Sequence, residues 1–208
     1  MKKTFFTLVL LAGLSGAAQA QRNYYESPVF AGLKAGGSIS TLQGTAVRNS
    51  KDIYGFHLGA LLSIGLSRHF SVQPELLYSQ KGGKLIAYSG QEATRRFHYI
   101  DVPVAVHGRI GSVFAELGPQ LSVLVTANET TSDASTSISD NYNLLDIGYV
   151  AGFGYQPKTG FGVGLRYNGP FISSAKAVEI SSGNGKTQLN IRHSVVQLYV
   201  NYLFKNRR

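Results

Sequence analysis

The sequence contains no cysteine in its 208 residues. Without thiols, the protein can form neither disulfide bonds nor thiolate metal sites, and cysteine-based redox chemistry is excluded. Stability must therefore come from a large hydrogen-bonded framework or from a well-filled interior.

Long hydrophobic runs are missing after residue 20. A transmembrane helix needs about 20 predominantly apolar residues in a row, and no later stretch approaches that length. Lipid leaves no backbone polar group free to go unpaired, so the remaining way to span a bilayer is a closed β-barrel. Charged residues make up 15% of the chain, whereas 24 glycines, 12 tyrosines and 11 phenylalanines are present. Glycine exceeds its usual share of about 7%, and the composition favours a barrel.

The first 20 residues have the features of a secretory signal peptide. Lys2 and Lys3 precede an apolar run, which ends in the small-residue pattern AQA. This order of basic, apolar and small residues predicts a signal peptide over 1–20 with cleavage before Gln21. The length of the segment 21–208 suits one domain, which we expect to be a β-barrel. The alternative, a retained membrane anchor, is disfavoured because the apolar run is short for a spanning helix. No cysteine follows the cleavage site, which excludes a bacterial lipid anchor.

The net charge is +9 with histidines neutral, and it stays positive after removal of the two N-terminal lysines. A basic balance can indicate binding to nucleic acid. An exported chain rarely meets nucleic acid, however, so we expect no nucleic acid partner and assign the counter-charges to outer-membrane lipid and lipopolysaccharide phosphates. The basic loop residues that would ring the outer rim are Arg48, Lys51, Lys84, Arg95, Arg96, Lys176 and Lys186.

Alternation of apolar and polar residues at period two divides the chain into eight candidate strands. They lie near 29–42, 53–66, 70–82, 96–108, 112–127, 143–156, 161–172 and 191–204. Three connections are short, at 67–69, 108–112 and 156–160, and four are long and polar, at 43–52, 83–95, 128–142 and 173–190. An even number of strands with short turns on one rim and long loops on the other is typical of an outer-membrane barrel. The predicted fold class is an all-β, eight-stranded, antiparallel, up-and-down transmembrane barrel.

The phase of the strands indicates which face meets lipid. In the segment 96–108, Val104 and Val106 share an apolar face, and Asp101 and His107 share the opposite face. The other strands alternate in the same way, and their second face mixes charges, amides and glycines as a narrow polar lumen would. Outward aromatics form two sets, as expected for headgroup-level girdles. Near the short turns these are Phe70, Tyr155, Phe161, Tyr202 and Phe204, and near the long loops Tyr54, Phe56, Tyr78 and Tyr167.

Two observations leave alternatives open. A soluble β-sandwich also has alternating, aromatic-containing strands, although it does not require alternating short and long connections.

Pro74, Pro103 and Pro119 fall inside predicted strands, where a closed barrel has no edge to accept a residue without an N–H group. Either bulges or a locally frayed ladder would accommodate these prolines.

Six stretches carry a resemblance to a known family. They are FAGLKAGGSISTL at 30–42, FSVQPELLYSQKGGK at 70–84, YIDVPVAV at 99–106, FAELGPQLSVLV at 114–125, GYVAGFGYQ at 148–156 and GFGVGLRYNGPF at 160–171. The sequence resembles the PorT-like outer-membrane β-barrel family, often labelled the porin family, of Bacteroidota. The resemblance implies an eight-stranded barrel in the outer membrane of a Gram-negative envelope. It gives no basis for assigning to this protein the founding member's role in protein secretion. The tail departs from the terminal aromatic usual in such barrels, because Phe204 is followed by KNRR. Recognition by the barrel-assembly machinery would then rely on an internal strand.

Inward phase predicts a polar network in the lumen. Its ionisable members are Lys34, His57, Glu75, Asp101, His107, Glu116, Asp146 and Arg166, and the amides expected beside them are Gln73, Gln120, Gln197 and Asn201. Because the interior of an eight-stranded barrel is about wide enough for its side chains to fill, these charges should pair across the lumen and plug it. The alternative is a proton or solute path, since polar groups inside membrane proteins are functional candidates.

Other motifs give little support for catalysis or cofactors. His69 and Ser71 match a His-x-Ser pattern of lipid-modifying barrels, but no carboxylate is placed to orient the histidine. The stretch GNGKT at 183–187 lacks the first glycine and the helix of a phosphate-binding loop. The spacing of histidines and acids predicts no metal site and no cofactor. We therefore expect a non-enzymatic outer-membrane barrel that is structural, or that binds an envelope protein partner through its long loops. The alternative is a narrow passive channel for small solutes or ions.

Overall fold

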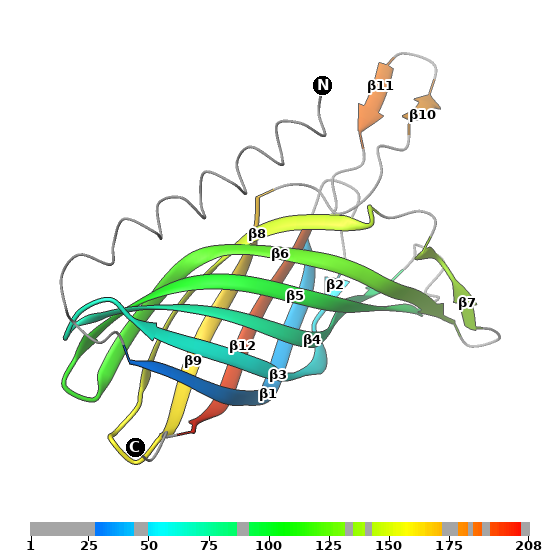
Figure 1. Ribbon diagram of the computed structural model, residues 1–208. Coiled ribbons are helices and arrows are strands. Elements are labelled where there is room, and N and C mark those ends of the chain that lie inside the picture. The colour runs from blue at the N-terminus through cyan, green and yellow to red at the C-terminus, as the bar shows by residue number, and fades with distance from the viewer. Residues whose placement is uncertain are drawn as a thin grey trace.

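A computed structural model describes residues 28–43, 50–86, 92–131, 135–139, 143–171, 179–182, 185–188 and 192–204. The predicted signal peptide and the loop residues Arg48 and Lys176 lie outside these ranges. Eight long strands form the body of the protein (Figure 1): β1 (Val29–Gln43), β3 (Ile53–Gly65), β4 (Phe70–Ile86), β5 (Glu92–Ile110), β6 (Val113–Thr130), β8 (Leu145–Tyr155), β9 (Phe161–Pro170) and β12 (Arg192–Leu203). Four short strands accompany them: β2 (Ser50–Lys51), β7 (Ser135–Ser137), β10 (Glu179–Ser182) and β11 (Gly185–Gln188).

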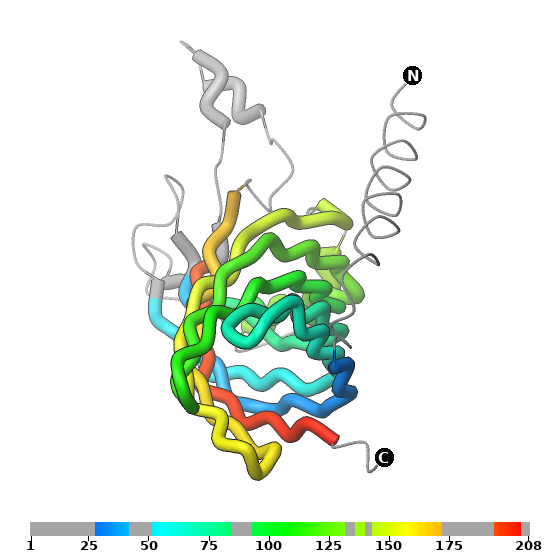
Figure 2. The backbone as a smooth tube through the Cα atoms, turned by 60° about the vertical axis from the view of Figure 1, so that its left-hand side comes forward, coloured from blue at the N-terminus to red at the C-terminus, as the bar shows by residue number. Residues whose placement is uncertain are grey.

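The eight long strands form a closed antiparallel ring. Around the ring, the order is β4-β3-β1-β12-β9-β8-β6-β5, and β5 returns to pair with β4. The first and last long strands, β1 and β12, pair over an unbroken register from Gly32↔Leu203 to Gln43↔Arg192. Figure 2 shows the strands curling around a common axis. The predicted fold class is therefore confirmed, and the soluble sandwich is excluded.

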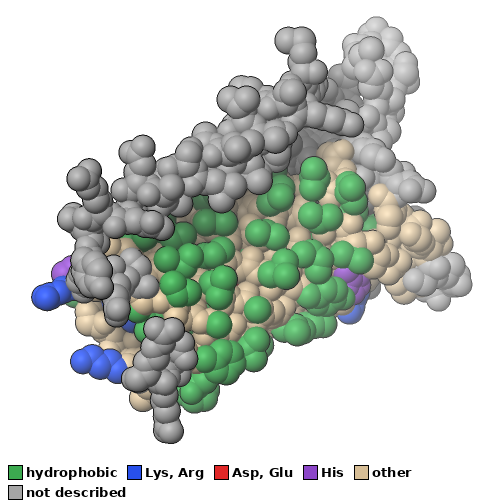
Figure 3. All heavy atoms as spheres, in the orientation of Figure 1, with side chains coloured by type: hydrophobic (Ala, Val, Ile, Leu, Met, Phe, Trp, Pro, Cys, Tyr) green, Lys and Arg blue, Asp and Glu red, His purple; other side chains and the backbone are tan. Residues whose placement is uncertain are grey.

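The strands turn their apolar side chains outward. Val104 is 41% exposed and Leu198 is 61% exposed, whereas Asp101 and Gln197 on the opposite faces of the same strands are buried. On the part of the wall that is visible in Figure 3, hydrophobic side chains are spread over the middle of the barrel. This inside-out distribution is typical of a barrel whose wall contacts hydrocarbon and whose lumen is polar. Among the described residues, no helix is long and apolar enough to cross a membrane.

Short connections lie at one end of the barrel, together with both ends of the described chain. The turn between β5 and β6 contains two residues, and its first residue, Gly111, has a φ of +63° that favours glycine. At the same end, the backbone N–H of Phe204 donates to the carbonyl of Ala31 at 2.8 Å, and that of Gly65 donates to the carbonyl of Pro28 at 3.0 Å. We refer to this end as the short-turn rim.

The strands that end in the longest hairpins extend further than the sequence predicts. β4 continues to Ile86, β5 begins at Glu92 and β6 continues to Thr130, whereas the predicted loops begin or end at 83, 95 and 128. β7 adds to β6, and β2 adds to β4. β10 pairs with β11, which contains Gly185, Lys186 and Thr187 of the GNGKT stretch, so these three residues lie in a strand and not at the start of a helix. The loop predictions at 83–95 and 128–142 are therefore too long, because backbone pairing continues where hydrophobic alternation stops.

The in-strand prolines interrupt the ladder without shifting it. Pro74 breaks the β3–β4 pairing, Pro103 the β4–β5 pairing and Pro119 the β5–β6 pairing, each over two residue pairs with the same register on both sides. The recorded register shift lies between His98 and Tyr99, away from all three. Locally frayed pairing, rather than a bulge, thus accommodates each residue that lacks an N–H group.

Aromatic side chains gather at both ends of the outward apolar band. Near the short-turn rim, the ring of Tyr202 contacts Phe161 and Phe204, with centroid distances of 4.7 and 5.4 Å. Near the long loops, Phe56 contacts Tyr78 at 5.9 Å. Tyr149 and Phe171, which the sequence prediction did not include, also contact each other near the long loops.

Candidate functional site

A group of charged and polar side chains converges inside the barrel from six strands. They are contributed by β1, β4, β5, β6, β9 and β12, and all point inward at buried positions. We call this group the central cluster; its members are Lys34, Glu75, His107, Glu116, Arg166 and Tyr199. Because the strands are joined in an antiparallel ring, residues far apart in sequence come to the same depth of the lumen.

Arg166 connects the two carboxylates of the central cluster. Its Nη1 and Nη2 donate to Glu75 Oε2 and Oε1, both at 2.8 Å. Its Nε donates to Glu116 Oε1 at 2.9 Å, and its Nη2 also donates to Glu116 Oε2 at 2.6 Å. The planar guanidinium thereby forms two-point contacts with both acids, which is the geometry that arginine provides and lysine does not.

The remaining acceptor sites of the two carboxylates are also used. Lys34 Nζ and Gln73 Nε2 donate to Glu75 Oε1 at 2.6 and 2.8 Å. The Tyr199 hydroxyl donates to Glu116 Oε1 at 3.0 Å, and Lys34 Nζ lies 4.0 Å from the centroid of the same tyrosine ring. Two cations therefore balance two anions, which is what burial of ions requires.

Three potential metal ligands also meet in the central cluster. Ligand atoms of Glu75, His107 and Glu116 lie within 4.8 Å of one another. Sequence spacing gave no indication of this group, since its members come from three different strands. His107 Nε2 lies 3.1 Å from Glu116 Oε2. Because Arg166 and Lys34 already bind the carboxylate oxygens, the group is arranged as an ion-pair network and not as an open ligand set.

A second ion pair lies closer to the long loops. Lys81 Nζ is 2.8 Å from both carboxylate oxygens of Asp101, and it lies 4.9 Å from the centroid of the Tyr99 ring. Lys81 is buried. Lys81 is not among the residues predicted to line the lumen, because it stands at the edge of the predicted strand and beside two glycines, which are typical of a loop. Its inward phase, shared with Glu75, was the available signal.

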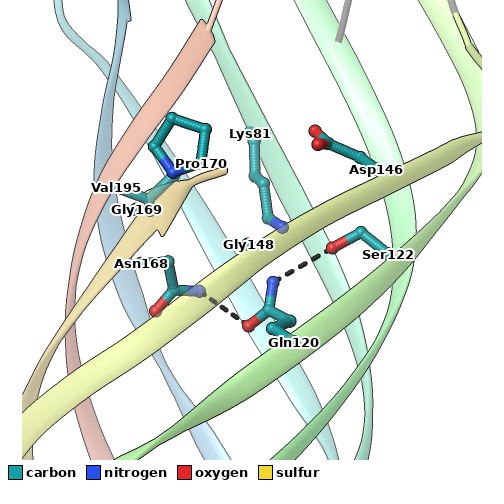
Figure 4. Close-up of a pocket in the computed structure, with 9 residues that line it drawn as sticks. All are labelled: Lys81, Gln120, Ser122, Asp146, Gly148, Asn168, Gly169, Pro170 and Val195. Carbon is teal, nitrogen blue, oxygen red and sulfur yellow. Dashed lines mark hydrogen bonds between the residues drawn. The ribbon is translucent and has the colours of Figure 1, made fainter. Parts of the chain in front are cut away.

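Two members of the predicted network take other positions. His57 is buried near Tyr199, with ring centroids 6.5 Å apart, and neither ring nitrogen has a hydrogen-bond partner among the described residues. Asp146 is half-buried and lies in the wall of a small cavity on the loop side of the central cluster (Figure 4). In this cavity, Asn168 Nδ2 donates to Gln120 Oε1 at 3.2 Å, and Gln120 Nε2 donates to Ser122 Oγ at 3.0 Å.

Buried apolar side chains flank the charged groups inside the barrel. Toward the short-turn rim lie Leu61, Phe114 and Leu203, all buried. Toward the long loops lie Phe97 and Leu124, also buried. Buried apolar side chains thus accompany the charged and polar groups inside the described part of the barrel.

His69 and Ser71 do not form a catalytic pair with an acid. Both line an open cavity at the short-turn rim, and no carboxylate is among the described residues that line it. The backbone N–H of His69 donates to Ser67 Oγ at 3.3 Å.

Several solved structures are similar to this chain. Neisserial surface protein A is similar with a TM-score of 0.55 at 13% identity, over 84% of this chain and 97% of that one. Ail, the attachment invasion locus protein of Yersinia pestis, gives 0.48 at 16% identity over 86% and 100%. The outer membrane protein OprG of Pseudomonas aeruginosa gives 0.45 at 10% identity over 88% and 98%. The first similarity shows a shared fold.

Among curated proteins, none matches this sequence. The description "Outer membrane protein beta-barrel domain" belongs to the family that matches residues 17–176. This match covers more than half of the chain, and it agrees with the closed ring and the outward apolar wall. The protein therefore belongs to the outer membrane protein beta-barrel domain family and is an integral protein of the outer membrane.

Proposed function

We propose that this barrel is plugged, and that it serves the envelope through its surface and loops instead of conducting solutes. The observation that carries the proposal is the contact of Arg166 with both Glu75 and Glu116 across the lumen. A solute passing the central cluster would have to separate a buried, charge-balanced network. Breaking such a network leaves ions without partners in a region of low dielectric, which costs several kcal/mol per ion.

Conductance of the purified protein in planar lipid bilayers tests this proposal. We expect no steady single-channel steps, whereas a wide-pore barrel reconstituted in parallel gives clear steps. Steady steps from the unmodified protein would refute the plug and favour a narrow passive channel for small solutes or ions. The polar cavity around Gln120 and Asn168 would then be part of its path.

We further propose that basic side chains at the loop end contact lipopolysaccharide phosphates. Arg96 is exposed there, and Arg95 pairs with Glu129 on the neighbouring strand. Lys51 and Lys84 lie in the paired segments of the same end. An envelope protein partner would also meet this end, because loops on a rigid scaffold carry most binding functions. Crosslinking from the loops in intact cells, followed by mass spectrometry, would identify lipid or protein neighbours.

Three further expectations remain part of this proposal: membership of the PorT-like family, processing of residues 1–20, and insertion by the barrel-assembly machinery. So does the absence of enzymatic activity, which is supported by the lack of a carboxylate among the described residues lining the cavity of His69 and Ser71. Release of acyl chains from lipopolysaccharide by the pure protein, with loss of that release in His69→Ala, would contradict it. Insertion that is unaffected by depletion of the assembly machinery would contradict the partner assignment.

A further inference from the structure

The short-turn rim opens into a cavity that the central cluster does not use. Two adjoining spaces of about 240 and 310 Å³ share Phe30, Arg109 and Leu203 in their walls. Ligand sites in proteins typically measure about 300–1,000 Å³. The joined space is therefore large enough for a small ligand, and we call it the rim cavity.

Cations surround the rim cavity without a matching acid. Arg68 lines one part, Lys158 lines the other, and Arg109 lines both. No carboxylate lies among the described residues of either part. Figure 3 shows Lys and Arg side chains projecting at this end of the barrel, and no Asp or Glu side chain is visible there on the face drawn. The rim cavity is thus electrostatically suited to an anion.

The acids of the central cluster do not neutralise these cations. Arg109 pairs with Phe114 on β6, and Glu116 is the next inward residue of that strand. Both oxygens of Glu116 are engaged by Arg166, and one also accepts from Tyr199. Arg109 therefore faces the rim cavity with its positive charge uncompensated by a described carboxylate.

The wall of the rim cavity is largely apolar. Phe30, Leu203 and Pro157 line it, and Phe70 borders the part that contains His69. An inorganic anion would gain nothing from these groups, whereas an alkyl chain would bury apolar surface against them at roughly 25 cal/mol per Å². The combination of cations and apolar wall fits an anion that carries a hydrocarbon chain.

We propose that the rim cavity binds a single-chain anionic amphiphile, with its carboxylate or phosphate held by Arg109 and Lys158 and its first methylenes against Phe30 and Leu203. Short turns of outer-membrane barrels face the periplasm, and the aromatic set that includes Phe161 and Tyr202 lies at the same end. The ligand would enter from the inner leaflet, as a free fatty acid or as a single-chain phospholipid. The buried apolar side chains of Leu61, Phe114 and Leu203, which lie between the cavity mouth and the central cluster, would keep the ligand from passing further into the lumen.

Photo-crosslinking tests the proposal on the full-length protein in zwitterionic lipid nanodiscs. The probes are a diazirine-bearing laurate, the corresponding lysophosphatidylglycerol and the corresponding neutral dodecanol. We expect either anionic probe, or both, to label peptides that contain residues 28–30, 156–160 or 203, and the stronger label identifies the source. The neutral probe should label these peptides at least tenfold less. We expect Arg109→Gln with Lys158→Gln to reduce anionic labelling at least tenfold.

The matched control is Arg96→Gln, which removes a cation at the opposite end of the barrel and should leave labelling unchanged. Heat-dependent electrophoretic mobility verifies that each variant is folded. If the double variant fails to fold, Lys158→Gln alone, which lies in an exposed turn, takes its place in the comparison of anionic labelling. Equal labelling by the neutral probe, labels confined to the lipid-facing aromatics, or competition by inorganic phosphate as effective as that by laurate would overturn the proposal. None of these outcomes depends on whether the lumen conducts.

Discussion

Replacement of Arg166 by methionine would remove the guanidinium from the centre of the lumen while retaining a side chain of similar length. Four hydrogen bonds would be lost, two to Glu75 and two to Glu116. Glu75 would keep its contacts with Lys34 and Gln73. Glu116 would keep the Tyr199 hydroxyl and the neighbouring His107.

The expected loss of stability follows from the charge that remains. In the wild-type protein, two cations balance two carboxylates, whereas the variant buries one carboxylate in excess. Removing one partner of a buried ion pair costs about 3–5 kcal/mol. With a urea m-value of about 2 kcal/mol/M, the unfolding midpoint should fall by about 2 M.

Urea titration in lipid vesicles measures this shift. The chain has no tryptophan, so the folded fraction is best followed by heat-dependent electrophoretic mobility. Glu116→Gln should destabilise the wild-type protein but stabilise the Arg166→Met variant, because it removes the excess charge. Arg96→Met, at an exposed position, should change stability by no more than about 0.5 kcal/mol. An unchanged midpoint for Arg166→Met, or the same sign for Glu116→Gln in both backgrounds, would refute the description of the cluster as a balanced network.

Other substitutions test the packing and orientation of the wall. A Cβ at Gly164 would collide with the Tyr199 ring, whereas one at Gly37 would meet nothing within 4 Å. Gly164→Ala should therefore cost about 1–3 kcal/mol and Gly37→Ala nothing, as judged by the same titration. Leu198→Arg, on the outward face, should cost about 2–4 kcal/mol in vesicles, and the absence of any loss would indicate that this face does not meet hydrocarbon. Mass spectrometry of protein from outer membranes should give an N-terminus at Gln21; an intact Met1 would contradict the predicted processing.

Strand number and strand orientation could be predicted from the sequence because hydrocarbon imposes period-two alternation wherever the wall is in lipid. The ends of β4, β5 and β6 could not be predicted in the same way. Beyond the apolar band, polar side chains are tolerated on both faces of a strand, so alternation is lost although the backbone remains paired. The pairing of Lys84 with Thr94, for example, leaves no hydrophobic signal.

The inward residues of the central cluster were also predictable, whereas their partners were not. Phase assigns Glu75, Glu116 and Arg166 to the lumen, but the contact between Glu75 and Arg166 crosses the ring between β4 and β9. Such a contact depends on the stagger of every strand pair between them, which a single sequence does not specify. The participation of Tyr199 was missed for a related reason, since its hydroxyl reaches Glu116 over Gly164.

The distribution of prolines has a consequence for how the ring can hold together. β3 and β4 are neighbours in sequence, and so are β5 and β6, so short covalent turns keep these pairs adjacent even where Pro74 and Pro119 remove hydrogen bonds. β1 and β12 have no such tether, and bringing together chain segments so far apart costs more loop-closure entropy. Their twelve consecutive residue pairs contain no proline. The pairing of β1 with β12, which no short turn holds in place, is thus among the strand pairings that proline does not interrupt.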